Sequence, residues 1–153
     1  MTTGQIVLLA AVALALGFGA WRAVVDGRFR GTHPVRGAGA PAAENTAEPG
    51  VLDGTDIAHV LGERATLLQF SSAFCAPCRA TRRILGEVAA LVPGVTHVEI
   101  DAEHHLELVR RVGVLRTPTT LILGADGREV TRAAGTPRRD EVLTTLARVA
   151  IPE

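Results

Sequence analysis

The sequence predicts an α/β fold in which a central mixed sheet is flanked by helices, preceded by one N-terminal transmembrane helix. Strand and helix patterns alternate over residues 51–153, an uninterrupted apolar stretch covers residues 6–21, and the segment between them is rich in Gly, Pro and Ala. We therefore divide the chain into a transmembrane anchor at residues 1–26, a flexible linker at residues 27–50 and one domain at residues 51–153.

The composition limits the classes of partner. Hydrophobic residues make up 47% of the chain and aromatic residues only 3%, so the core must be built from Leu, Val, Ile and Ala. The 16 basic residues balance 16 acidic ones, which gives a formal net charge of zero. Without a net positive field, the chain is not expected to bind nucleic acid.

The apolar stretch IVLLAAVALALGFGAW is short but sufficient for a membrane span. The alternatives are a buried core helix and a cleaved signal peptide, although Met1 to Gln5 carries no basic residue of the kind that starts a signal peptide. Four arginines follow the stretch and none precedes it: Arg22, Arg28, Arg30 and Arg36. The positive-inside rule then predicts a single-pass protein of the cell membrane with a cytoplasmic domain, and an extracytoplasmic domain is the alternative.

The predicted linker, GRFRGTHPVRGAGAPAAENTAEPG, has no apolar periodicity. As a flexible coil it would span roughly 25 to 30 Å between its ends. We expect this tether to let the domain reach partners near the membrane.

The first half of the domain contains two predicted helices and two predicted strands. A short helix covers Asp56 to Leu61 and ends at Gly62, and the apolar run Thr66 to Phe70 is a strand. The next helix runs from Cys75 to about Leu91, before Pro93-Gly94 stops it. Its apolar residues recur at helical spacing: Ile84, Leu85, Val88 and Leu91. The alternating segment Val95 to Asp101 is the second strand.

The second half continues with a helix, two strands and a final helix. Glu103 to Val112 is a helix ended by Gly113, and the strands Thr119 to Leu123 and Glu129 to Ala133 are joined by a turn at Asp126-Gly127. The last helix is expected to start with Thr136 as its N-cap and Pro137 in its first turn. It presents four residues to the core: Val142, Leu143, Leu146 and Val149.

The two cysteines lie at a predicted strand-to-helix junction, as Cys75-Ala76-Pro77-Cys78. The N–H groups and dipole at a helix N-terminus stabilise an anion, so Cys75 is expected to be the attacking thiolate. Cys78 lies one turn further in, close enough to close a disulfide and to resolve a mixed disulfide. Arg79 follows directly and adds positive potential.

Two other interpretations of the cysteine pair stay open. A zinc site normally needs four ligands, and one CxxC supplies two; the other candidates in the domain are His59, His97, His104 and His105. A metallochaperone that uses both thiolates and a histidine is the corresponding function. Two inert buried cysteines are the other interpretation.

Residues 66–150 resemble a thioredoxin-family domain. The apolar strand before CxxC, the VEID strand, the GVLRTPTTLIL stretch, the ADGREV hairpin and the AAGTP segment follow the order of that family. Pro118 follows Cys75 by 43 positions, a spacing similar to plain thioredoxins. This leaves no room for the insertion found in the membrane-tethered, cytochrome-maturation branch.

The resemblance implies a thiol-disulfide oxidoreductase whose redox centre is the Cys75–Cys78 disulfide, with no other cofactor and no metal. It also implies that Pro118 is cis and packs against the disulfide, and that the backbone of Thr117 binds an extended substrate segment as an added strand. The substrate-binding residues implied are Phe74, Ala76, Pro77, Thr117, Pro118 and Gly135. No flavin or nicotinamide motif is found in the sequence, so electrons are expected from a protein donor.

The sequence departs from the family pattern at one buried position. Thioredoxins bury an aspartate six positions before the first cysteine, where it helps to deprotonate the resolving cysteine; here the residue is Gln69, which cannot take a proton. His97 stands where the family has a lysine beside that aspartate. We therefore expect a Gln69–His97 pair, or a water, to serve as the proton relay.

The main prediction is a membrane-anchored reductase of disulfides in protein partners. A non-catalytic, thioredoxin-shaped adaptor that holds a partner at the membrane is an alternative of a different class. Extracytoplasmic thiol-disulfide exchange in cytochrome c maturation is a further alternative, should the domain face outward.

Overall fold

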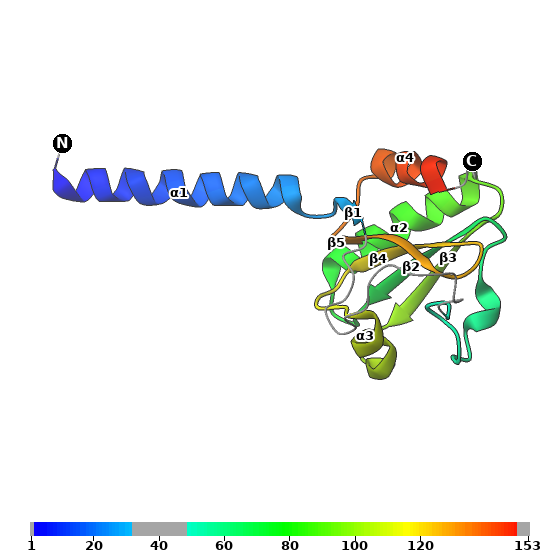
Figure 1. Ribbon diagram of the computed structural model, residues 1–153. Coiled ribbons are helices and arrows are strands. Elements are labelled where there is room, and N and C mark those ends of the chain that lie inside the picture. Colours follow the sequence, from blue (N-terminus) through cyan, green and yellow to red (C-terminus); the bar gives the residue numbers. More distant parts are fainter. Residues whose placement is uncertain (1, 32–48, 150–153) are drawn as a thin grey trace, which may run out of the picture.

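The computed structural model describes residues 2–31 and 49–149. A long helix, α1, leads into an α/β domain with helices on both faces of a sheet (Figure 1). The elements are α1 (Thr3–Val25), β1 (Phe29–Gly31), the 3₁₀ turn η1 (Ala58–Val60), β2 (Ala65–Ser71), α2 (Ala76–Leu91), β3 (Val95–Asp101), α3 (Leu106–Val112), β4 (Thr119–Gly124), β5 (Glu129–Ala134) and α4 (Arg139–Val149).

The sheet has the strand order β1-β5-β4-β2-β3 and is mixed, as predicted. β2 and β3 are parallel, and the other neighbouring pairs are antiparallel. In the antiparallel pair β2–β4, Phe70 lies opposite Thr119. The end of β2 therefore meets the start of β4, where the cysteine loop and the segment before Thr119 come together.

Two apolar clusters hold the helices onto the sheet. On one face, side chains of α2 and α4 such as Leu85 and Leu146 pack against Leu67 of β2. On the other, Leu108 of α3 packs with Phe70. Every residue of β2 is buried, because this strand is covered on both faces. This burial explains why β2 carries no charged residue and does not alternate between apolar and polar residues.

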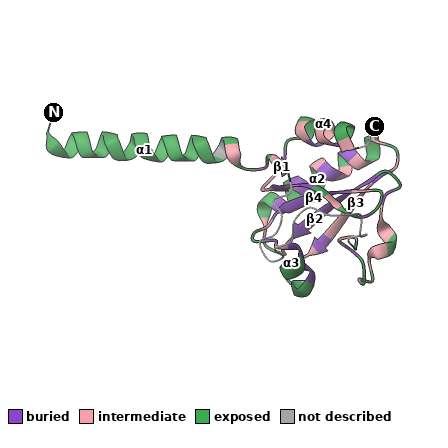
Figure 2. Ribbon diagram, in the orientation of Figure 1, coloured by how far each residue is buried: buried purple, intermediate pink, exposed green. Residues whose placement is uncertain are grey.

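α1 projects from the domain, and its residues are exposed along nearly the whole length (Figure 2). Its 23 residues form a rod of about 34 Å, and it is long and apolar enough to cross a bilayer core of about 30 Å. The alternative of a buried core helix is wrong, because no part of the span Thr3–Arg22 is buried.

Three helix starts differ from the sequence-based prediction. The helix predicted at residues 56–61 is only the turn η1, before the N–H of Gly62 donates to the Thr66 hydroxyl and the chain enters β2. α3 begins at Leu106 and not at residue 103, because the Asp101 carboxylate accepts the N–H of Glu103 and forms a local turn.

The start of α4 is the third correction. α4 begins at Arg139, and Thr136 does not act as its N-cap. The Thr136 hydroxyl donates instead to the carbonyl oxygen of Pro77, 3.4 Å away, and lies 3.3 Å from the Thr81 hydroxyl. A contact between distant segments thus replaces the local cap that the sequence suggested.

The largest difference concerns the predicted linker at residues 27–50, whose residues 32–48 lie outside the described residues. Its first part is ordered as part of the sheet: β1 pairs with β5, with Phe29 opposite Ala133. The N–H of Gly27 donates to the carbonyl oxygen of Ala134 at 2.9 Å, and the N–H of Phe29 donates to Glu141 of α4 at 3.0 Å. A three-residue strand is too short to give a recognisable period in the sequence.

Gly27 is essential to this docking. Its φ is +80°, and a Cβ at this position would overlap the backbone carbonyl of Thr136. Gly54 has a similar φ of +75°, but a Cβ there would meet nothing within 4 Å. Alanine substitutions at these two glycines therefore distinguish the loss of stability due to the backbone conformation from the loss due to the overlap with Thr136.

We expect Gly27→Ala to destabilise the fold more than Gly54→Ala. The left-handed conformation costs a non-glycine residue roughly 1–2 kcal/mol at either site. The overlap with Thr136 should add at least about 2 kcal/mol at position 27 alone. Urea unfolding of the full chain in detergent measures both losses, and equal losses would contradict the close docking of residue 27.

Candidate active site

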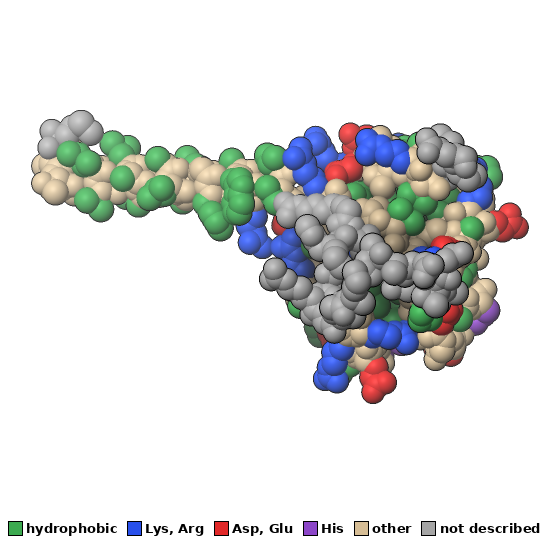
Figure 3. Space-filling model, in the orientation of Figure 1, with side chains coloured by type: hydrophobic (Ala, Val, Ile, Leu, Met, Phe, Trp, Pro, Cys, Tyr) green, Lys and Arg blue, Asp and Glu red, His purple; other side chains and the backbone are tan. Residues whose placement is uncertain are grey.

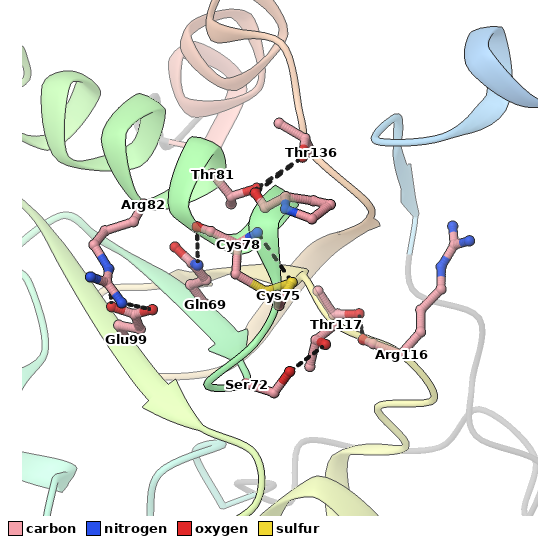
Figure 4. Close-up of a disulfide and its surroundings, with 12 residues drawn as sticks. Gln69, Ser72, Cys75, Cys78, Thr81, Arg82, Glu99, Arg116, Thr117 and Thr136 are labelled. Atoms are coloured by element: carbon pink, nitrogen blue, oxygen red, sulfur yellow. Dashed lines mark hydrogen bonds and ion pairs between the residues drawn. A yellow bond between two sulfur atoms is a disulfide. The ribbon is translucent and has the colours of Figure 1, made fainter.

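The cysteine pair lies where β2 ends and α2 begins (Figure 4). Cys75 is the N-cap of α2, with extended backbone, and forms a disulfide with Cys78 across a Cα–Cα distance of 5.2 Å. The N–H of Cys78 donates to the Cys75 sulfur at 3.2 Å. Because the helix N-terminus points at this sulfur, the arrangement can stabilise negative charge on Cys75 in the reduced state.

The two cysteines differ in accessibility. Cys75 is half-buried, whereas Cys78 is 2% exposed. The side chain of Phe74 is almost fully exposed beside the pair, and Ala76 and Pro77 are also exposed. A partner can therefore reach Cys75 first, while Cys78 is shielded by the protein.

A second loop meets the cysteine loop at the start of β4. The Thr117–Pro118 peptide bond is cis and Pro118 is buried, as the resemblance implied. The hydroxyl of Thr117 lies 3.2 Å from that of Ser72, which joins the two loops directly. The N–H of Gly135 donates to the carbonyl oxygen of Pro118 at 2.8 Å. The residues predicted to bind substrate thus come from three segments that the fold brings together.

Sequence reasoning missed a hydroxyl contact at the first turn of α2. Thr81 is fully buried, and its hydroxyl donates to the carbonyl oxygen of Pro77 at 3.1 Å. Thr136, from the loop after β5, bonds to the same carbonyl. Thr81 was visible in the sequence as a polar residue on the apolar side of α2, four positions after Pro77, but its distant partner was not.

The predicted pair of Gln69 and His97 is in contact beneath the disulfide. Gln69 is fully buried and donates from Nε2 to the carbonyl oxygen of Cys78 at 3.0 Å. Its Oε1 therefore faces His97 Nε2, 3.2 Å away, which must carry the proton in this bond. Nδ1 of the neutral imidazole remains as the nitrogen able to accept a proton.

A charged pair lies on the same face of β3. Arg82 of α2 contacts Glu99 through two nitrogen–oxygen distances of 2.5 and 2.8 Å. Burial alone would raise the pKa of Glu99, but the hydrogen bonds from Arg82 and Ser71, together with the nearby positive charge, hold it below its usual value. Glu99 is therefore ionised at neutral pH.

A hollow of about 390 Å³ connects this charged pair to the disulfide. It is lined by Ser71, Ser72, Ala73, Cys75, Cys78, Arg79, Arg82, Glu99 and Asp101. The volume is sufficient for several waters, and the lining is polar. A proton that leaves Cys78 can therefore reach solvent or a carboxylate through this hollow.

Among the described residues, no group of three or more His, Cys, Asp and Glu side chains is placed to hold a metal ion. His104 bonds to Asp101, and His105 to the carbonyl oxygen of Asp101. These two histidines support the turn before α3.

Comparisons with known proteins agree with this geometry. The family model for thioredoxin matches residues 55–148. The chain is 31% identical over 91 residues to a thioredoxin of Alicyclobacillus acidocaldarius, covering 59% of this chain and 86% of that protein. It is 28% identical over 98 residues to a thioredoxin of Chlamydia trachomatis, covering 64% of this chain and 95% of that protein. The crystal structure of thioredoxin NaTrxh from Nicotiana alata superposes with a TM-score of 0.55 at 21% identity, covering 71% of this chain and all of the other.

We expect His97 to make the stability of the domain fall in mild acid. Burial lowers the pKa of His97, an effect that Glu99 opposes and Arg82 reinforces. The unfolded chain therefore binds the proton at higher pH than the folded one, so stability is lost as pH falls below the ordinary value of 6.5. His97→Asn should flatten this loss between about pH 7 and pH 5.5.

Urea unfolding at each pH measures the effect. Glu99 and Asp101, whose pKa values are also lowered, contribute only at more acidic pH, below their ordinary values of 4.5 and 3.8. Removal of the exposed His59 provides the matched control. A wild-type slope in His97→Asn would show that this histidine is not the titrating group.

Proposed function

We propose that this chain, a member of the thioredoxin family and therefore a disulfide oxidoreductase, reduces disulfides in partner proteins. In this proposal Cys75 attacks the substrate disulfide and Cys78 resolves the mixed disulfide. The observation that carries the proposal is the position of Cys75 as the N-cap of α2, accessible and bonded to the N–H of Cys78. The thiolate, which is the nucleophile in thiol-disulfide exchange, is stabilised there.

The reaction begins with the reduced pair. The Cys75 thiolate attacks one sulfur of the substrate disulfide, forms a mixed disulfide and releases the other substrate sulfur as a thiolate that takes up a proton. The Cys78 thiolate then attacks the Cys75 sulfur, forms the Cys75–Cys78 disulfide and releases the second substrate thiol. Two electrons and two protons pass to the substrate, and a protein dithiol donor restores the reduced pair.

The proposed substrate surface consists of the segments around Cys75. Phe74, Ala76 and Pro77 form its exposed border on the cysteine loop. The backbone of Thr117, held by the contact with Ser72, lies along the opposite border, where an extended substrate segment would add as a strand. The N–H of Gly135 is used internally by Pro118, so we assign Gly135 a supporting position at this border.

The proton of Cys78 is proposed to leave by one of two routes. Gln69 bonds to the carbonyl oxygen of Cys78 and not to its sulfur, so the Gln69–His97 pair acts on the backbone of the resolving cysteine. The hollow that Cys78 shares with Glu99 offers the second route, through water. The relay through His97 requires its neutral form, which its lowered pKa favours at neutral pH.

Anchoring through α1 and a cytoplasmic domain complete the proposal. The length and apolar surface of α1 support a single span, and the arginines after it support the cytoplasmic side. Cytoplasmic dithiols are kept reduced, which favours the reductase direction. Thiol-disulfide exchange outside the cytoplasm, including cytochrome c maturation, is the corresponding function if the domain faces outward.

We expect the two cysteine substitutions to have different effects. Cys75→Ser removes the nucleophile, so the rate of disulfide reduction should fall to background, by at least about a hundredfold. Cys78→Ser leaves the first attack intact, so a mixed disulfide with the substrate should accumulate on non-reducing gels. A Cys75→Ser protein with full cellular function would favour the adaptor instead.

We expect a membrane-impermeant maleimide to label Cys75 only after cells are lysed. Intact cells are first treated with a mild, permeant reductant so that the disulfide opens, and lysed cells serve as the positive control. The Cys75→Ser/Cys78→Ser double variant gives the background of the labelling. Labelling in intact cells would place the domain outside the cytoplasm and contradict the proposed topology.

A further inference from the structure

The end of α1 is attached directly to the border of the active site. Asp26, the C-cap of α1, forms an ion pair with Arg116 at 2.6 Å. The same guanidinium donates to the carbonyl oxygen of Ala134 at 3.0 Å, and the N–H of Gly27 donates to that carbonyl at 2.9 Å. Three segments that are distant in sequence therefore converge on one carbonyl group.

These contacts involve the two loops that border the disulfide. Arg116 directly precedes the cis Thr117–Pro118 bond. Gly135 leaves so little room that a Cβ would come within 3.0 Å of the backbone nitrogen of Gly27. In Figure 4, Arg116 lies beyond Thr117 as seen from the disulfide, and its side chain runs alongside the chain that leaves α1. The membrane helix and the catalytic cysteines thus share the same side of the domain.

The junction is short. Trp21 and Arg22 end the apolar span, as residues that commonly lie at the membrane interface do. From Arg22 to Asp26 the helix rises only about 6 Å. The N-terminal end of α2 lies on the side of the domain from which α1 leaves (Figure 1). The contacts of Asp26 and Gly27 therefore attach the domain directly to the end of α1, with the cysteine pair on that side, in contrast to the flexible tether of the sequence-based prediction.

Positive charge at the junction between α1 and the domain supports a position of this side of the domain near the membrane. Basic side chains gather where α1 meets the domain (Figure 3). Arg22 and Arg28 are exposed there. Cytoplasmic leaflets carry anionic lipids, which attract basic residues near a membrane span. This attraction would keep the active-site side of the domain facing the head groups.

We propose that the preferred substrates are disulfides of integral membrane proteins, placed in the first few residues outside the bilayer. The proposal rests on the function proposed above and adds the class of substrate. An extended segment that emerges from the bilayer enters the space between the head groups and Cys75, whereas a folded soluble protein must fit into the same narrow space. Restriction to the membrane surface also raises the effective concentration of such a disulfide.

The chemistry is the exchange described above. One substrate sulfur bonds to Cys75 and the other leaves as a thiol, and Cys78 then releases the first while the Cys75–Cys78 disulfide forms. The two electrons come from the reduced pair. A single-turnover measurement with the pre-reduced protein therefore needs no donor.

The experiment uses the full-length protein in lipid vesicles with two single-span peptides. Both peptides carry the same disulfide-closed loop, one directly after the span and one behind a Gly/Ser spacer of about 30 residues. We expect the wild-type protein to reduce the near loop at least about five times faster than the distant one. A soluble peptide with the same loop measures the intrinsic reductase activity.

Two insertion variants test the origin of the preference. A Gly/Ser segment of about 20 residues between Val25 and Asp26 adds roughly 25 Å of reach while the contacts of Asp26 and β1 remain. It should bring the ratio of the two rates to about one and leave the rate on the soluble peptide unchanged. The same segment before Thr2 lies across the bilayer and should preserve the wild-type ratio.

The outcomes separate the two proposals. Equal rates on the near and distant loops with the wild-type protein would overturn the inference, as would a preference that survives the insertion after Val25. Failure of the pre-reduced wild-type protein to reduce any of the three peptides would instead overturn the proposed reductase function.

Discussion

The burial of β2 on both faces is the constraint on which the site depends. Because β2 pairs with both β3 and β4 and every residue from Ala65 to Ser71 is buried, a shift in its register would disrupt both pairings and the packing on both faces. Its end is therefore fixed, and with it the start of α2 and the position of Cys75. The antiparallel pairing of Phe70 with Thr119 brings Pro118 to the same end of the sheet. One strand thus places both halves of the active site.

A neutral side chain, Gln69, lies beneath the disulfide at the position where the family pattern has an aspartate. Gln69 connects the carbonyl oxygen of Cys78 with His97, so every polar atom of its amide has a role in a fully buried position. The ionised group of this region, Glu99, is held at the border by Arg82. The ionised carboxylate thus lies in the hollow beside the cysteines, while the titratable His97 is bonded to Gln69 beneath them.

The sequence predicts the parts of the site that depend on local patterns. Cys75 at a strand-to-helix junction, the cis Pro118 implied by the family resemblance and the Gln69–His97 contact are all found in the structure. The missed parts depend on distant contacts. Thr136 has the sequence of a helix cap, but its hydroxyl contacts Pro77 and Thr81 of α2, and α4 begins only at Arg139. Phe29 lies in a segment of linker composition, yet the free edge of β5 recruits it.

β1 also determines where the catalytic unit begins. β1 covers one edge of β5, and an uncovered strand edge offers unpaired N–H and C=O groups to other chains. A soluble form that starts at residue 51 would lack β1 and present β5 as an aggregation-prone edge. A boundary placed at Asp26 keeps this edge covered. The segment needed for a soluble form is therefore longer than the family match, which starts at residue 55.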